Sequence, residues 1–136
     1  MRVFIDTSAL IAYYNIDDLH HSKALDVFTR MGADESSITR LFTTDFVFDE
    51  TITVLECVLK QPELALQVGE ALLNSPFTTL LRVDEDIFYE AWIYFKNKRG
   101  YSFTDCTSFI AMKRLGITCA FTLDSHFRSA GFQTLP

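Results

Sequence analysis

Four acidic side chains, far apart in the chain, stand where short expected elements begin or end. They are Asp6, Glu50, Asp105 and Asp124. Two carboxylates about 5 Å apart repel by about 3 kcal/mol at an effective dielectric of about 20, so a fold that gathers all four needs cations or protons there. Hard divalent cations such as Mg²⁺ prefer carboxylate oxygens, and the chain offers no cluster of cysteine or histidine for a softer metal. The four acids therefore predict a carboxylate cage for Mg²⁺ or Mn²⁺.

A cage of this kind suits the displacement of an oxygen at phosphorus. A divalent cation can lower the pKa of a water molecule and clamp the phosphate oxygens while that water attacks. In the expected arrangement Asp6, Glu50 and Asp105 hold the ion, and Asp124 completes the cage or positions the water. The chemistry indicated is hydrolysis of a phosphodiester bond.

Each acid also has an ordinary structural interpretation. Asp6 and Asp105 could cap helices, and Asp124 could form an Asx turn. Glu50 is harder to explain in this way, because it lies inside a mostly apolar helical segment, where a charge usually has a partner. The spacing of the acids therefore permits the cage without requiring it.

Apolar runs that favour strands alternate with segments of helical periodicity. The expected strands are residues 2–5, 41–43, 78–83, 119–122 and 132–135. Short, uniformly apolar strands that alternate with helices predict an α/β fold, with a parallel sheet covered by helices on both faces. Ligands bind beyond the carboxyl ends of such strands, so Asp6 and Asp124 should lie side by side if their strands are neighbours.

Two helices and one loop matter for placing these acids. Thr44 or Asp45 should cap the helix that carries Glu50, and Thr104 should open the helix that carries Asp105. Residues 33–39 are expected to form a loop. The predicted buried stripe of the Glu50 helix consists of Phe48, Ile52, Leu55 and Leu59.

The composition sets limits on the class of protein. A chain of 136 residues, 49% of them hydrophobic, predicts a single domain over residues 1–136. The net charge is −6, whereas proteins that hold nucleic acid by broad phosphate neutralisation are usually basic, so any such contact should be local or made through metal ions. No run is apolar enough to span a bilayer, so no membrane partner is expected. Three cysteines without Cys-x-x-Cys spacing favour a reducing, cytoplasmic location.

The four acidic motifs, taken in order, resemble those of the PIN domain family. The closest likeness is to its VapC type, the ribonuclease half of toxin–antitoxin pairs. The motifs are Val-Phe-Ile-Asp-Thr-Ser-Ala-Leu at residues 3–10, Asp-Glu-Thr at 49–51, Ser-Phe-Thr-Asp-Cys at 102–106 and Phe-Thr-Leu-Asp-Ser-His-Phe at 121–127. The resemblance covers nearly the whole chain. It implies a three-layer α/β/α fold with a short central parallel sheet, and an endoribonuclease that depends on Mg²⁺ or Mn²⁺.

The resemblance also implies a set of catalytic residues and partners. Asp6, Glu50, Asp105 and Asp124 would be the catalytic and metal-binding residues. The implied partners are an RNA substrate, a cognate antitoxin and a second copy of the chain in a homodimer. Some family members carry a further acid directly after the fourth motif, where this chain has Ser and His at residues 125–126. The number of metal ions therefore stays open.

Other residues near the motifs allow two interpretations each. Thr7, Ser8 and Thr104 could orient the carboxylates, although Ser8 could equally cap its helix. His126 could be a general acid or a structural residue near a turn. The basic run at residues 96–99 could guide an RNA backbone or complement a helix dipole. Three aromatic residues of the preceding helix could form an interface, namely Tyr89, Trp92 and Tyr94.

Two other functions compete with the ribonuclease. A non-catalytic PIN-like module that binds RNA or protein would not need the acids, and the presence of all four counts against it. A phosphoaspartate enzyme would need a second acid close after Asp6, where Ser8 stands. The sequence does not identify which RNA is cut, the antitoxin or the preferred metal.

Overall fold

The structure, a computed structural model, describes residues 1–33 and 37–136. The described chain contains a five-stranded sheet of order β3-β2-β1-β4-β5, in which every neighbouring pair of strands is parallel. The strands are β1 (Arg2–Ile5), β2 (Arg40–Thr44), β3 (Thr78–Leu81), β4 (Cys119–Phe121) and β5 (Gln133–Leu135). The loop expected at residues 33–39 is present at residues 37–39, and residues 34–36 lie outside the described residues.

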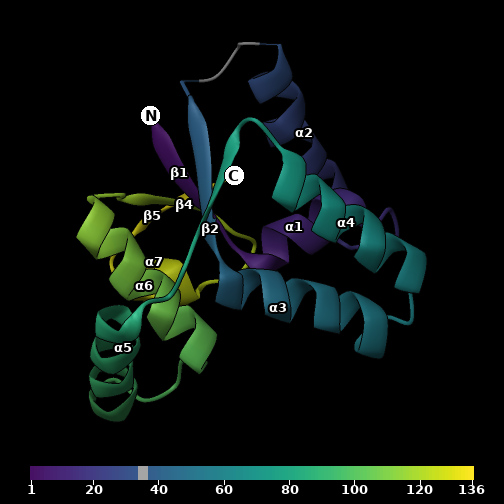
Figure 1. The fold of residues 1–136 in the computed structure, drawn as a ribbon. Coiled ribbons are helices and arrows are strands. Elements are labelled where there is room, and N and C mark those ends of the chain that lie inside the picture. The colour runs from purple at the N-terminus through teal and green to yellow at the C-terminus, as the bar shows by residue number, and fades with distance from the viewer. Residues whose placement is uncertain (34–36) are drawn as a thin grey trace.

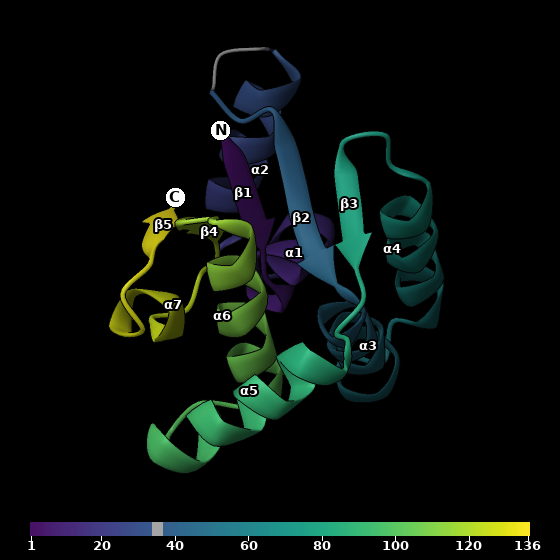
Figure 2. The same cartoon turned by 60° about the vertical axis from the view of Figure 1, so that its left-hand side comes forward.

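Helices cover both faces of the sheet, which confirms the three-layer α/β/α prediction. They are α1 (Thr7–Tyr14), α2 (His21–Gly32), α3 (Asp45–Thr53), α4 (Pro62–Asn74), α5 (Glu85–Asn97), α6 (Phe103–Leu115) and α7 (His126–Ser129). The helices α1, α2 and α4 lie on one side of the sheet, and α6 and α7 lie on the other (Figure 1). Helix α5 packs against α6, and α3 lies beyond the ends of β2 and β3 toward which their arrows point (Figure 2).

At the starts of α3, α5 and α6, a side chain accepts a hydrogen bond from a free backbone N–H group. The Thr44 hydroxyl accepts from Val47 N–H at 3.1 Å, as predicted for the start of α3. The helix that was predicted to open at Thr104 begins one residue earlier, at Phe103. Ser102 caps that helix instead, because its hydroxyl accepts from Asp105 N–H at 3.0 Å. Gly116 ends α6 with a φ of 68°, a conformation that glycine adopts without steric cost.

The buried stripe of α3 differs from the prediction. Val47, Thr51 and Leu55 are buried, whereas Phe48 and Ile52 are half-buried and Leu59 is exposed. The Thr51 hydroxyl lies 2.7 Å from the Val47 carbonyl oxygen, so this polar side chain is buried with a hydrogen bond. The helix continues as a π-helical turn, η1 (Val54–Val58), which the sequence did not indicate. The shifted stripe turns Glu50 toward the carboxyl ends of the strands.

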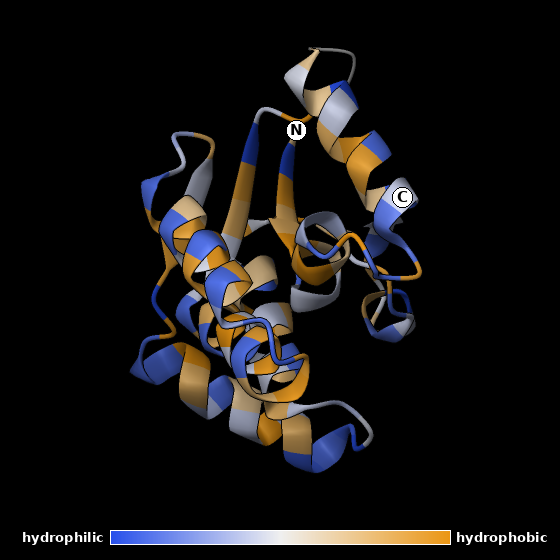
Figure 3. Ribbon diagram, turned by 90° about the vertical axis from the view of Figure 1, so that its right-hand side faces the viewer, coloured by the Kyte–Doolittle hydropathy of each residue, from blue (hydrophilic) through white to orange (hydrophobic). Residues whose placement is uncertain are grey.

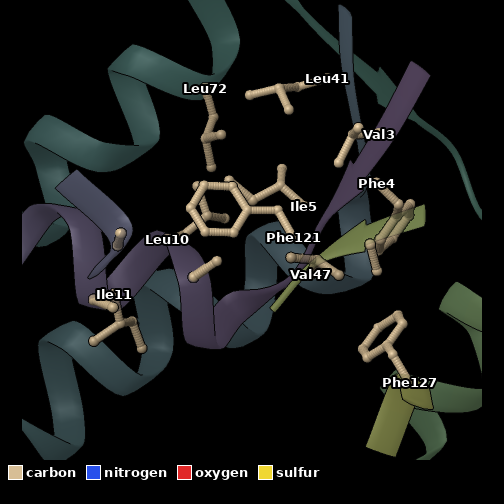
Figure 4. Packing of buried hydrophobic residues seen from close by; sticks show 14 of the residues in the cluster. Val3, Phe4, Ile5, Leu10, Ile11, Leu41, Val47, Leu72, Phe121 and Phe127 are labelled. Carbon is tan, nitrogen blue, oxygen red and sulfur yellow. The ribbon is translucent and has the colours of Figure 1, made fainter. Parts of the chain in front are cut away.

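The core fills both spaces between the sheet and its helices. On one face of β1, Ile5 packs with Leu10 of α1 and Leu72 of α4. On the other face, the Phe4 ring lies 6.1 Å from the ring of Phe127 in α7 (Figure 4). Strands β1 and β2 are hydrophilic at their first residue and hydrophobic directly after it (Figure 3). Among the described residues, no helix is long and apolar enough to cross a bilayer.

The strand order brings two of the predicted acids to one edge. Strands β1 and β4 are neighbours, with Ile5 paired to Phe121. Asp6 follows β1 directly, and Asp124 follows β4 after two further residues. The strands that precede Asp6 and Asp124 are therefore neighbours, as the predicted side-by-side placement of the two acids requires.

Candidate active site

Asp6 is a buried carboxylate that points toward β4. Its backbone N–H donates to the Phe121 carbonyl at 3.1 Å, which extends the pairing of β1 and β4 by one residue. Asp6 occupies the N-cap position of α1, but its side chain makes no capping hydrogen bond. Its Oδ2 atom instead lies 3.2 Å from the hydroxyls of both Ser8 and Thr122. The capping interpretation of Asp6 is therefore wrong.

The two hydroxyls also connect Asp6 to the segment that carries Asp124. They lie 3.1 Å from each other. Ser8 Oγ accepts from Leu123 N–H at 2.9 Å, and Thr122 Oγ1 accepts from Asp124 N–H at 3.3 Å. The position of the Asp6 carboxylate is thus coupled to the backbone that positions Asp124.

Asp124 does form the Asx-type contact that its sequence context allowed. Its Oδ1 atom accepts from His126 N–H at 2.9 Å. The negative charge of Asp124 also raises the pKa of Asp6, so the same carboxylate lies within electrostatic range of the first acid. The turn fixes Asp124 without removing it from the site.

Asp105 lies in the first turn of α6 and is only 6% exposed. It does not cap the helix, because Ser102 does. Its Oδ2 atom lies 2.8 Å from Nδ1 of His126, whose side chain is 46% exposed. This hydrogen bond is the main reason why the pKa of His126 is raised above its ordinary value. His126 therefore belongs to the site, where it spans from the Asp124 turn to Asp105.

Glu50 reaches the site from the α3 layer. Its carboxylate is hydrogen-bonded to Thr7, the first residue of α1. The Thr7 hydroxyl in turn lies 3.1 Å from the hydroxyl of the buried Thr51. Glu50 therefore has the partner that its position in an apolar helix led us to expect.

The electrostatics show that the acids share one environment. The pKa of Asp6 is raised from 3.8 to about 7, mainly by burial, and the charges of Asp124, Asp105 and Glu50 contribute to this rise in that order of size. Burial is also the main cause of the raised pKa values of Glu50 and Asp105, to which neighbouring carboxylates add. In the described part of the chain, His126 is the only basic residue in an ion pair with any of the four. The site therefore has an unbalanced negative charge.

The donor chemistry of this site fits a hard divalent cation. All four acids offer carboxylate oxygens, and a cation would relieve the repulsion that contributes to the raised pKa values of Asp6, Glu50 and Asp105. As the side chains stand, residues 1–33 and 37–136 contain no group of three or more His, Cys, Asp or Glu side chains close enough to hold one ion.

Of the three residues predicted to orient the carboxylates, two contact an acid and one does not. Thr7 contacts Glu50, and Ser8 contacts Asp6. Among the hydrogen bonds of the described residues, none joins the Thr104 side chain to an acid, and the Thr104 carbonyl accepts from Thr107 instead. Sequence reasoning missed Thr122, which touches Asp6. The signal available for it was a threonine at the end of a strand, two residues before Asp124.

The chain resembles known proteins along nearly its whole length. A sequence model described as the PIN domain matches residues 3–133. The 23S rRNA-specific endonuclease VapC20 of Mycobacterium tuberculosis is 31% identical over 132 residues, which cover 96% of this chain and 95% of that protein. A VapC ribonuclease of Archaeoglobus fulgidus is 28% identical over 130 residues, which cover 93% of this chain and 80% of that protein.

The similarity extends to three dimensions. The crystal structure of M. tuberculosis VapC20, described as a toxin that cleaves the sarcin–ricin loop, matches with a TM-score of 0.82 and 30% identity. The match covers 96% of this chain and 95% of that one.

Proposed function

The chain belongs to the PIN domain family, and we propose that it is a metal-dependent endoribonuclease of the VapC type, the toxin of a toxin–antitoxin pair. One observation carries this proposal beyond the resemblance. Carboxylates from three other segments, those of Glu50, Asp105 and Asp124, together raise the pKa of Asp6, which is 2% exposed. Buried negative charges that lie close together destabilise a fold unless they bind a cation.

Each acid has a role in this reaction. Asp6, Glu50 and Asp105 would hold a Mg²⁺ or Mn²⁺ ion, and Asp124 would complete the cage or position the attacking water. When bound, the ion would lower the pKa of the attacking water and stabilise the charge on the phosphate oxygens. Asp124 is half-buried and held by its turn, so it is suited to orient that water in line with the departing oxygen.

Neutral and basic side chains hold the acids in place. The hydroxyls of Ser8 and Thr122 orient Asp6, and Thr7 orients Glu50. His126 orients Asp105 through the hydrogen bond from its Nδ1 atom. The exposed side of the His126 ring leaves room for a nucleotide to approach.

The substrate we propose is RNA. The relative VapC20 is named for cleavage of 23S rRNA, and its crystal structure is described as that of a toxin that cleaves the sarcin–ricin loop. An RNA stem-loop with the sequence of that ribosomal element is therefore the first specific substrate to test. A reducing, cytoplasmic location is consistent with this substrate and with the three free cysteines.

The proposal includes two protein partners, an antitoxin and a second copy of the chain. Helix α5 exposes large apolar side chains that a partner could cover. They are Phe88, Tyr89, Trp92 and Ile93. Tyr94, which the sequence grouped with this surface, is half-buried and packs against Tyr101 and Phe109 instead.

Cleavage of total RNA tests the proposed function. We expect wild-type protein to cut RNA in the presence of Mg²⁺, and we expect EDTA or the Asp6→Asn substitution to abolish cleavage. Asp17→Asn, which changes an exposed aspartate between α1 and α2, is the matched control and should cut normally. A wild-type protein that binds RNA but never cuts it would support the non-catalytic module instead.

A further inference from the structure

A polar hollow lies beside the acid site, on the side of the sheet covered by α6 and α7. It has a volume of about 640 Å³. Its walls come from the end of α5, the segment that follows it, the last turn of α6 and the end of α7. The side chains that matter here are Tyr94, Lys98, Arg99, Tyr101 and Lys113. None of these residues belongs to the four acidic motifs.

The charge of this hollow is opposite to that of the whole chain. Lys98, Arg99 and Lys113 line it, and no Asp or Glu among the described residues does. These three cations form no ion pair within the described residues. Three arginines elsewhere do form such pairs, namely Arg30 with Asp26, Arg82 with Asp45, and Arg114 with Glu90. In a chain of net charge −6, the hollow is therefore a local positive site.

Aromatic rings hold two of these cations in place. The Arg99 guanidinium carbon lies 4.4 Å from the centre of the Phe95 ring. The Lys113 ammonium lies 5.2 Å from the centre of the Tyr94 ring. Cation–π contacts of this kind keep a charged head group near an aromatic wall. Basic side chains together with aromatic walls are the usual means of holding a single nucleic-acid strand without sequence preference.

The hollow is connected to the acid site through two rings. Tyr101 lines the hollow, and its ring lies 5.7 Å from the His126 ring in an edge-to-face arrangement. His126 in turn lies 2.8 Å from Asp105. The hollow lies toward the C-terminal end of α6 and Asp105 lies in its first turn, so a strand that extends from the hollow to the acids would pass Tyr101 and His126.

The positions of the cations have a simpler explanation that accounts for only part of these observations. Lys98 follows the C-terminus of α5, and Lys113 lies in the last turn of α6, so each complements a helix dipole. That role requires neither a shared hollow nor tyrosine walls. It also does not explain why the cations of two helices meet next to Tyr101.

We infer that this hollow binds the sugar–phosphate backbone of the RNA beside the bond that is cut, with Lys98, Arg99 and Lys113 contacting phosphates and Tyr101 contacting a base. The inference rests on the proposed ribonuclease function. Because the chain as a whole is acidic, it needs a local positive surface to contact RNA phosphates, and the hollow would supply that surface. It also favours an unpaired strand over a duplex, because paired bases cannot stack on a protein ring.

Binding rather than cleavage tests this inference, so that its failure differs from failure of the ribonuclease proposal. The protein is the Asp6→Asn variant, and the probe is a fluorescent single-stranded RNA whose anisotropy is followed at several salt concentrations. The test variant adds Lys98→Gln, Arg99→Gln and Lys113→Gln. The matched control adds Arg30→Gln, Lys60→Gln and Arg82→Gln, which change the net charge equally. Thermal melting confirms that both variants are folded.

We expect the hollow variant to lose at least tenfold in affinity, and the control variant to lose less than twofold. The slope of log Kd against log salt should fall by about 2, since each lost phosphate contact on a single strand contributes about 0.7. A duplex of the same length should bind more weakly than the single strand to the protein with an intact hollow. Equal affinities of the hollow and control variants would overturn the inference, whether or not wild-type protein cuts RNA.

Discussion

The Thr122 hydroxyl lies 3.2 Å from the Asp6 carboxylate, although 116 positions separate the two residues in the chain. The contact exists because β1 and β4 are neighbouring parallel strands whose carboxyl ends meet. The same hydroxyl accepts from the backbone N–H of Asp124. One buried hydroxyl therefore sets the relative positions of the first and fourth acids.

The Thr122→Val substitution should impair the site while keeping the shape of the side chain. We expect RNA cleavage and Mg²⁺ affinity to fall together by about 10- to 100-fold, the usual effect of removing a group that orients a metal ligand. Titration of cleavage rate against Mg²⁺ concentration measures both. Thr118→Val, at an exposed residue directly before β4, is the control and should behave as wild type. If Thr122→Val matches that control, the hydroxyl does not orient Asp6.

The role of His126 can be separated into orientation and proton transfer. In His126→Asn the side-chain amide can still donate to Asp105 from near the position of Nδ1, whereas His126→Phe has no donor. We expect the asparagine variant to keep most of the cleavage rate and the phenylalanine variant to lose about tenfold or more. Single-turnover rates measured at saturating Mg²⁺ test this difference. Equal, large losses in both variants would mean that the imidazole itself takes part in proton transfer.

The strands and the order of the acids could be predicted from the sequence. Each strand is a short apolar run, and Asp6 and Asp124 follow two such runs closely. The neighbouring position of β1 and β4 could not be derived from spacing alone, because it depends on the path of the whole chain. Four-residue helices such as α7 show too little periodicity to predict, so His126 could not be placed beside Asp105.

The buried stripe of α3 was mispredicted for a physical reason. The segment offers two overlapping helical stripes, and the one with phenylalanine and isoleucine is the more hydrophobic. The buried stripe contains Thr51 instead, and burial of Thr51 is tolerable because its hydroxyl bonds within the site. Similarly, Ser102 rather than Thr104 caps α6, because its hydroxyl accepts from the N–H of Asp105, three residues later. Local chemistry at the site thus overrode simple periodicity.

The metal-free protein should be less stable at neutral pH than in mild acid. Asp6 has a pKa of about 7 in the fold against 3.8 for the ordinary carboxyl. Below about pH 4 both folded and unfolded chains are protonated at Asp6, and as the pH rises to 7 only the unfolded chain releases this proton. The free energy of unfolding therefore falls over this range. The raised pKa values of Glu50, Asp105 and His126 act in the same direction.

Urea unfolding of wild type and Asp6→Asn in EDTA measures this effect. The variant should gain stability relative to wild type as the pH rises, by at most about 4 kcal/mol at neutral pH. The control Asp17→Asn should show no such trend. Added Mg²⁺ should stabilise wild type and leave Asp6→Asn nearly unchanged. A difference between wild type and Asp6→Asn that does not vary with pH would refute the raised pKa of Asp6.

Calorimetric titration of Mn²⁺ into the wild type and four amide variants tests the central claim most directly. The variants are Asp6→Asn, Glu50→Gln, Asp105→Asn and Asp124→Asn. If four carboxylates from distant segments form one metal site, wild type binds Mn²⁺ and each variant binds it at least about tenfold more weakly. A wild type that takes up no Mn²⁺, or variants that bind it as wild type does, would contradict the account.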